Sequence, residues 1–195
     1  MLSSKLVEKH EDPRVSRTHK LITRAFVDLM AEKMFQSITI QDIADRATVN
    51  RATFYAHFED KFDLLDRYTH EGFQEWMDKK MTLREDLNLS QLKDLVTTVF
   101  EFIAEVETHC TSTTKQIEPL FESSIQEALA DYLLNWFTQA AKQGIFLRQP
   151  ATTVAHVWSW AIFGAGIRWS RESKAIPSNE MAAQVVDILT SPIES

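Results

Sequence analysis

The chain has 195 residues, enough to bury a sizeable hydrophobic core in one domain or in two small ones. Hydrophobic residues make up 44% of it and charged residues 25%, which excludes a disordered or fibrous protein, and its four Gly and five Pro favour helices over a turn-rich sheet. The formal net charge of -7 argues against a uniformly basic nucleic-acid binder.

The N-terminal residues 1–13 show no apolar periodicity and end in Asp12-Pro13, which predicts a mobile tail. Charges stand where a secretion signal needs an apolar core, so we expect no export. A first helix is expected from Arg14 to a break at residues 35–38, because apolar side chains recur at three-and-four spacing. These side chains are Leu21, Ile22, Ala25, Phe26, Leu29 and Met30.

Two short helices are expected next, each announced by its cap. Thr39 and Asp42 have the spacing of a capping box, which predicts a second helix up to about Ala47. Asn50 is a favourable N-cap residue and predicts a third helix over 51–58.

Longer helices fill the rest of the chain. Each shows apolar residues at helical spacing, and Gly144 is expected to act as a C-cap. The expected helices are one capped by Asp60, one capped by Ser90 that runs to Cys110, and three over about 124–143, 152–171 and 178–190.

Residues 39–58 have the spacing of a helix-turn-helix, with two short helices and a four-residue turn. Ala44 allows the helices to approach, and Phe54 and Phe58 supply inner faces. Between Arg14 and Phe58 there are seven Arg/Lys against four Asp/Glu, so this segment carries +3 and the rest of the chain -10. The N-terminal quarter alone is therefore suited to face a polyanion.

The run TIQDIADRATVNRATFYAHFEDKFDLL resembles the signature of the TetR family of bacterial transcription regulators, and the resemblance covers about residues 15–66. It implies an all-α fold of about nine helices, with a three-helix DNA-binding domain over 14–60 and a helical bundle over 61–195 that binds ligand and forms a homodimer. Three residues depart from the pattern. Thr48 replaces a turn glycine, which predicts a left-handed backbone there; Asn50 replaces Ser or Thr; and Phe62 replaces an acidic residue.

The resemblance also implies roles for individual side chains. Phosphate contacts fall to Thr39, Tyr55, His57 and Lys61, and base contacts fall to Asn50, Arg51, Ala52 and Thr53. Arg51 suits guanine, Asn50 suits adenine, and the methyl groups of Ala52 or Thr53 suit thymine.

The acidic remainder is expected to hold an effector pocket and a dimer interface. The helix over 152–170 is apolar all round, which predicts burial on both sides, on its own core and on a partner subunit. Ordinary core packing predicts the same aromatic pattern as an effector pocket does. Gly72 lies in the helix capped by Asp60, where it either eases a ligand-driven movement of that helix or permits a close packing contact. Pocket candidates are Phe100, His109, Cys110, Phe121, Trp136, Phe137, His156 and Phe163, and interface candidates are Trp158, Ala161, Ala165, Trp169, Val185, Ile188 and Leu189.

The sequence thus predicts a repressor that a small molecule releases from palindromic operator DNA. A DNA-binding protein of the same fold that is controlled by a protein partner, or by no effector, would show the same sequence pattern. We find no nucleophile elbow, HExxH motif, phosphate-binding glycine loop or Cys/His cluster, so we expect no enzyme, cofactor or metal. The single Cys110 suits a reducing cytoplasm, and the least charged stretch, 151–167, is shorter than the ~20 residues of a membrane span.

Overall fold

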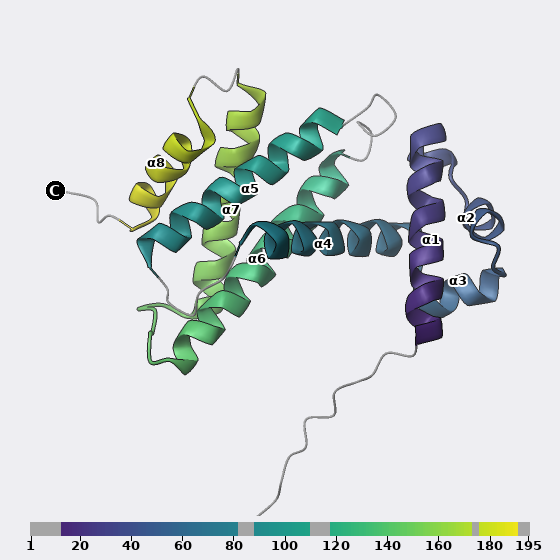
Figure 1. The fold of residues 1–195 in the computed structure, drawn as a ribbon, viewed down its shortest axis with the longest axis horizontal. Helices are drawn as coiled ribbons and strands as arrows, with labels where there is room; N and C mark the ends of the chain where they lie inside the picture. The colour runs from purple at the N-terminus through teal and green to yellow at the C-terminus, as the bar shows by residue number, and fades with distance from the viewer. Residues whose placement is uncertain (1–12, 82–87, 110–117, 173–175, 191–195) are drawn as a thin grey trace, which may run out of the picture. The chain divides into compact units, whose positions relative to one another are not determined.

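The computed structural model describes residues 13–81, 88–109, 118–172 and 176–190. All regular structure in these ranges is helical, with eight α-helices and one short 3-10 helix (Figure 1), which confirms the predicted all-α fold. The chain divides into two compact units, residues 1–64 and 65–195. The domain limits expected from the sequence, 14–60 and 61–195, differ from this division by residues 61–64, the first turn of α4 (Lys61–Lys80).

The first unit contains α1 (Pro13–Glu32), η1 (Phe35–Ser37), α2 (Ile40–Ala47), α3 (Arg51–His57) and the start of α4 (Lys61–Lys80). α1 packs against α2, and α2 packs against α3. Pro13 opens α1, and the rest of the predicted tail lies outside the described residues. The buried core of this unit consists of Ile22, Ala25, Phe26, Leu29, Met30, Phe35, Ile38, Ile43, Ala44, Ala47, Phe54, Phe58 and Leu64.

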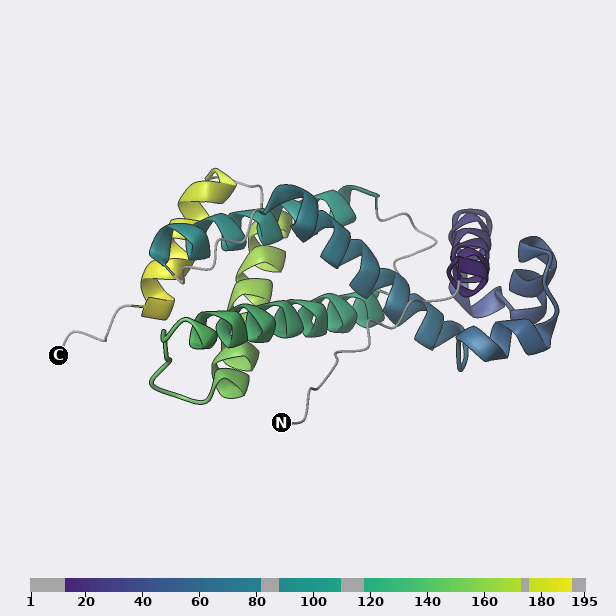
Figure 2. The same ribbon diagram turned by 60° about the horizontal axis from the view of Figure 1, so that its bottom comes forward.

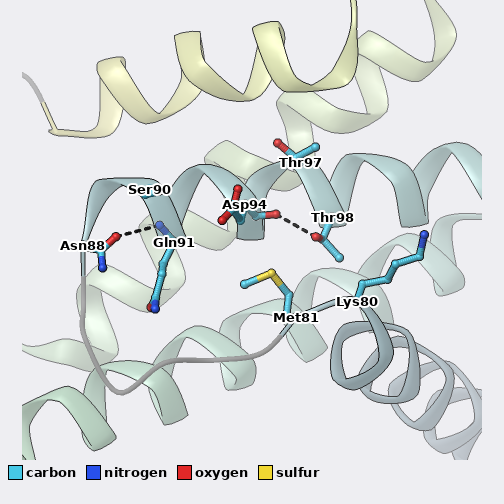
Figure 3. A pocket seen from close by; sticks show the side chains of 8 residues that line it. All are labelled: Lys80, Met81, Asn88, Ser90, Gln91, Asp94, Thr97 and Thr98. Carbon is cyan, nitrogen blue, oxygen red and sulfur yellow. Dashed lines mark hydrogen bonds between the residues drawn. The ribbon is translucent and has the colours of Figure 1, made fainter.

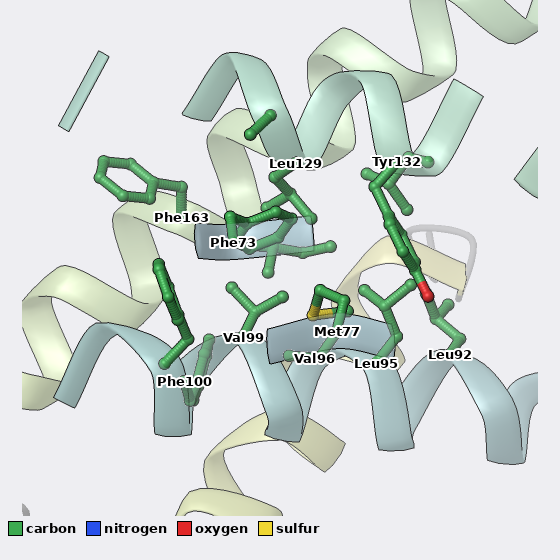
Figure 4. Close-up of a cluster of buried hydrophobic side chains, with 14 of the residues drawn as sticks. Phe73, Met77, Leu92, Leu95, Val96, Val99, Phe100, Leu129, Tyr132 and Phe163 are labelled. Atoms are coloured by element: carbon green, nitrogen blue, oxygen red, sulfur yellow. The ribbon is translucent and has the colours of Figure 1, made fainter. Parts of the chain in front are cut away.

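The second unit contains the remainder of α4 with α5 (Leu89–His109), α6 (Glu118–Lys142), α7 (Ala151–Arg171) and α8 (Ser178–Thr190). α7 packs on α5, α6 and α8, and it crosses from α5 to α6 in both views (Figures 1 and 2). Apolar side chains of α4, α5, α6 and α7 meet in one buried cluster (Figure 4). Such a core accounts for the long apolar faces of these helices.

The predicted bounds of α8 and the predicted C-cap of α6 agree with the structure. α8 covers the predicted 178–190. α6 ends at Lys142, and Gly144 follows it, whose φ of +86° and the 3.1 Å bond from Ile145 N to Ala140 O form the expected C-cap. The predicted cap at Ser90 is wrong: Asn88 Oδ1 accepts from Gln91 N at 3.0 Å, so α5 begins at Leu89. α6 also begins earlier than predicted, at Glu118.

The second unit contains two glycines with opposite surroundings. A Cβ added to Gly166 would lie 2.6 Å from Ile103 Cδ1, so α7 and α5 approach closely there. A Cβ added to Gly72 would meet no described atom within 4 Å, which makes the expected close packing contact at Gly72 wrong. None of the described helices is both long and apolar enough to cross a membrane.

Candidate nucleic-acid interface

The capping box predicted at the start of α2 is present. Asp42 N donates to Thr39 Oγ1 at 3.1 Å, and Thr39 N donates to Asp42 Oδ2 at 2.8 Å. The hydrogen bonds from Thr39, with the Lys33 ammonium at 2.9 Å, hold the pKa of Asp42 well below its usual range. α2 therefore starts at a fixed point, with Thr39 exposed beside its first free amides.

The turn between α2 and α3 confirms the left-handed backbone predicted for Thr48. Its φ is 58° and its ψ is 42°, and Val49 N donates to Ala44 O at 2.9 Å. This pairing closes the end of α2 as a Schellman motif does. The turn thus fixes the angle at which α3 leaves α2.

Asn50 caps α3, as predicted. Its Oδ1 accepts from Thr53 N at 2.7 Å and from Thr53 Oγ1 at 2.9 Å. One turn into the helix, Phe54 is fully buried, and its ring lies 5.7 Å from that of Phe58. Because Phe54 anchors one face of α3 in the core, the opposite face is left to solvent.

The solvent face of α3 carries two alanines one turn apart. Ala52 and Ala56 are exposed on the side of α3 away from Phe54. Beside them, Tyr55 is 49% exposed, and Arg51 donates from Nη2 to the Tyr55 hydroxyl at 3.3 Å. Sequence reasoning missed Ala56, although its place two residues after the buried Phe54 was the signal that identifies it.

His57 and Lys61 are both partly buried. The ring of His57 lies 6.4 Å from that of His19, which joins α3 to α1. Lys61 Nζ donates to the carbonyl oxygens of Phe35 at 3.0 Å, Gln36 at 3.2 Å and Ile38 at 2.9 Å. Its burial lowers the pKa of Lys61, and Asp60 opposes that change.

All three N–H groups of the Lys61 ammonium are therefore engaged by the protein. This geometry favours a structural role for Lys61, tying α4 to the segment before α2, over the phosphate contact implied by the resemblance.

Ion pairs occupy some of the positive charge of the first unit. Arg46 of α2 makes a bidentate pair with Glu32 of α1, at 2.9 and 2.7 Å. The Arg and Lys side chains of α1 lie between residues 14 and 24, and Arg51 is the arginine of α3. Those of α1 are Arg14, Arg17, Lys20 and Arg24.

The pocket candidates that the structure describes do not all come together. Phe100, Trp136, Phe137 and Phe163 lie in the buried cluster of the second unit, and Phe121 is half-buried. His156 is exposed, with Nδ1 2.8 Å from Thr152 O, so its side chain lies outside the buried cluster. The side chain of His109 and all of Cys110 lie outside the described residues.

A polar pocket of about 560 Å³ lies where α4 ends and α5 begins. Figure 3 shows Met81 extending toward the α5 side chains that share this space. None of the eight candidates lines it. The described lining residues are Lys80, Met81, Asn88, Ser90, Gln91, Asp94, Thr97 and Thr98. The part of the chain that is described holds no group of three or more His, Cys, Asp or Glu suited to a metal ion.

The interface candidates separate into two groups. Trp158 packs edge-on against Phe137 at 5.5 Å, and Trp169 stacks on Phe100 at 5.6 Å, so both contribute to the core of their own unit. Val185 is also buried, and Ala165 and Leu189 are half-buried.

Exposed apolar side chains nevertheless form a stripe on α7. Val157 is 59% exposed and Trp160 60% exposed, and Ala161 and Gly164 continue the same face. On α8, Ile188 is 76% exposed. Sequence reasoning missed Val157 and Trp160 as exposed residues, because a helix that is apolar all round does not reveal which face its own core takes.

Comparisons with known proteins agree with this geometry. Residues 22–68 match the profile of bacterial regulatory proteins of the tetR family. Over 88 residues the chain is 38% identical to the HTH-type transcriptional regulator YxbF of Bacillus subtilis, a stretch that covers 45% of this chain and 23% of that protein. The matches to curated relatives span 23% to 31% of those proteins' own length.

Solved structures share the fold over nearly the whole chain. The transcriptional repressor QsdR of R. erythropolis has a TM-score of 0.59 at 15% identity, covering 91% of this chain and 95% of that one. FadR of Thermus thermophilus has a TM-score of 0.56 at 19% identity, covering 91% and 97%. Residues 22–68, which contain α2 and α3, thus match the tetR family of bacterial regulatory proteins, and the chain shares its overall fold with these solved structures.

Proposed function

We propose that the protein is a transcription regulator that binds double-stranded operator DNA as a homodimer and that a small-molecule effector releases it. One observation carries the DNA-binding part: α3 is anchored by the buried Phe54 and held at a fixed angle by the turn at Thr48, while its opposite face is exposed. A short helix presented in this way fits the major groove.

The side chains and amides that contact the DNA phosphates flank the exposed face of α3. Tyr55 and His57 border α3, so these two side chains bind phosphates. The Thr39 hydroxyl already donates to Asp42 Oδ2 at 2.7 Å, which leaves the first backbone amides of α2 to contact DNA beside Thr39. Arg51 contacts a base edge, and the basic residues of α1 between 14 and 24 add a general attraction to the polyanion. Lys61 supports the interface by fixing the segment before Thr39.

Selection of bound duplexes from a random DNA pool tests this function. We expect an inverted repeat whose half-sites lie about one helical turn apart, or a multiple of it, and an affinity that falls steeply with salt. Arg51→Ala should weaken binding by about 1–3 kcal/mol and relax the preference at one base position. If the full chain binds no duplex in a salt-dependent manner, the proposed function is wrong.

The exposed stripe of α7, with Ile188 of α8, forms the contact between two copies. Exposed apolar side chains in a contiguous patch mark interaction sites. Two copies related by a two-fold axis would present two recognition helices to the two half-sites.

Ala161→Glu places a charge in this exposed face and should give monomers that lose operator affinity. Gln139→Glu, at an exposed position of α6, is the matched control and should stay dimeric. Analytical ultracentrifugation of both variants decides the point. A dimeric Ala161→Glu variant would exclude this interface.

Release by an effector has its own support in the second unit. Trp136 is 1% exposed, and its indole N–H has no acceptor among the described residues. An unmatched buried donor costs about 1–3 kcal/mol, which an oxygen of a bound molecule or a water would offset. FadR of Thermus thermophilus, which has a similar fold, was solved in complex with lauroyl-CoA, which supports a small-molecule ligand for a protein of this fold.

A ligand screen on the selected DNA tests this second part. A compound that releases DNA from the wild-type protein should lose potency against Trp136→Phe, which keeps the ring and removes the donor. A DNA-binding protein that no compound releases would favour the alternative, a regulator controlled by a protein partner or by no effector.

A further inference from the structure

The side chains of α3 and its cap include one amide, Asn50, and no carboxylate. The carbonyl oxygen of that amide already accepts two hydrogen bonds from Thr53, at 2.7 and 2.9 Å. Bidentate reading of adenine needs this oxygen for the N6 amino group and the amide nitrogen for N7. Asn50 therefore has only its two N–H hydrogens to offer to DNA.

The neighbouring polar groups of Thr53, Arg51 and Tyr55 also offer few hydrogen-bond acceptors to DNA. Thr53 gives its hydroxyl proton to Asn50, so its outer surface is a methyl group and a weak acceptor. Arg51 has five N–H donors and no acceptor, and one of them occupies the oxygen of Tyr55, whose own proton is left to donate. The guanidinium carbon also lies 5.9 Å from the centre of the Tyr55 ring, which keeps Arg51 against that side of α3.

Methyl groups occupy the middle of the exposed face of α3, opposite the buried Phe54. Ala52 and Ala56 are both exposed and one turn apart, and both stand opposite the buried Phe54. A base edge that lies against this face meets a hydrocarbon surface, and the base feature that complements it is the thymine C5 methyl group.

Resting on the proposed function, we infer that α3 reads hydrogen-bond acceptors and thymine methyl groups, and that it does not read the amino groups of adenine or cytosine. The contacted edges are guanine O6 and N7, opposite Arg51, and thymine, opposite Ala52 and Ala56. Asn50 is a cap that adds donors, and the adenine contact expected from the sequence is replaced by this assignment.

Base analogues in a selected duplex test the inference directly. The probe is the tightest duplex from the random pool, with one base replaced at a time in each half-site. Deoxyuridine for thymine removes the methyl group and should weaken binding about fourfold at one or two positions, the equivalent of one buried methyl group. Replacement of guanine by 7-deazaguanine should weaken binding at least about fivefold at one position, because it removes an acceptor.

2-Aminopurine for adenine removes the N6 amino group from the major groove and keeps pairing with thymine. We expect no position at which this replacement weakens binding by more than about twofold. A larger loss with 2-aminopurine, or selected half-sites whose binding responds to neither deoxyuridine nor 7-deazaguanine, would overturn the inference.

Protein variants assign these effects to side chains. Asn50→Ser keeps an N-cap oxygen and removes the amide, and we expect its selected half-site to show the same adenine frequencies as the wild type. Loss of an adenine preference in Asn50→Ser would overturn the inference. Ala52→Ser and Ala56→Ser should each lose the response to deoxyuridine at one position.

The experiments distinguish failure of the proposed function from failure of this inference. Absence of salt-dependent binding to any duplex rejects both the function and the inference, whereas DNA binding that depends on amino groups rejects the inference alone.

Discussion

Replacing Thr48 by glycine should stabilise the protein, because Thr48 is held in the left-handed region at φ 58° and ψ 42°. A β-carbon in this conformation lies too close to the following carbonyl oxygen, at a cost of about 1–2 kcal/mol. The side chain is exposed, so its removal forfeits little burial. The hydrogen bond from Val49 N to Ala44 O requires the left-handed backbone, so the turn keeps the strain.

Glycine also makes the unfolded chain more flexible, which opposes the gain by about 0.5–1 kcal/mol. The net increase in the free energy of unfolding is therefore about 0.5–1 kcal/mol. For a protein of this length that unfolds as one unit, it raises the melting temperature by about 1–4 °C. The affinity for DNA should change little, since no predicted contact lies on the Thr48 side chain.

Urea unfolding followed by two signals measures the effect. All five tryptophans lie beyond residue 64, so fluorescence reports the second unit and circular dichroism reports both. Thr48→Ala is the control, because it retains the β-carbon and should gain much less than Thr48→Gly. Equal gains from alanine and glycine, or a loss with glycine, would refute strain at the β-carbon as the cause.

Three further predictions rest on single contacts. Gly166→Ala should destabilise the protein by about 1–3 kcal/mol in urea, since its Cβ would lie 2.6 Å from Ile103 Cδ1, whereas Gly72→Ala should stabilise it by about 0.5–1 kcal/mol. The folded protein lowers the pKa of Asp42, so its contribution is present above about pH 4 and is lost as pH falls further; Asp42→Asn should lower stability at pH 7 and flatten the acid limb of a pH titration of stability. Lys61→Met removes three charge-assisted hydrogen bonds and should cost about 1.5–3 kcal/mol of unfolding free energy, with little change in the salt dependence of DNA binding.

Most of the fold was predictable from local chemistry. Thr39 and Asn50 are good N-caps at the head of apolar-periodic segments, and Asp42 at capping-box spacing distinguishes Thr39 from Ser37, so the starts of α2 and α3 are correct. At the start of α5, Asn88 and Ser90 are both favourable caps two residues apart, and only the structure shows which oxygen the amide of Gln91 reaches. Local rules predict a helix start well when a second signal, such as a capping box, supports one of the candidates.

The buried face of α7 could not be predicted from the sequence, for a different reason. The helix is apolar on every side, so its periodicity does not identify the side that its own core covers. Trp158 and Trp160 are two residues apart, yet Trp158 packs on Phe137 while Trp160 is 60% exposed. The difference is set by where α6 crosses α7, which depends on residues far away in the sequence. Sequence reasoning therefore identified the helix and not its exposed face.

The functional side chains show the same dependence at the level of single atoms. Asn50 suits a helix cap and an adenine contact equally well by residue type, but both uses need the same oxygen, and the cap takes it. Lys61 suits a phosphate, but three carbonyl oxygens surround its ammonium. Since each polar atom can satisfy only a few partners, the bonds made in folding decide which donors and acceptors remain for DNA. The chemistry of a recognition helix follows from its residue types only after the atoms used by its caps are subtracted.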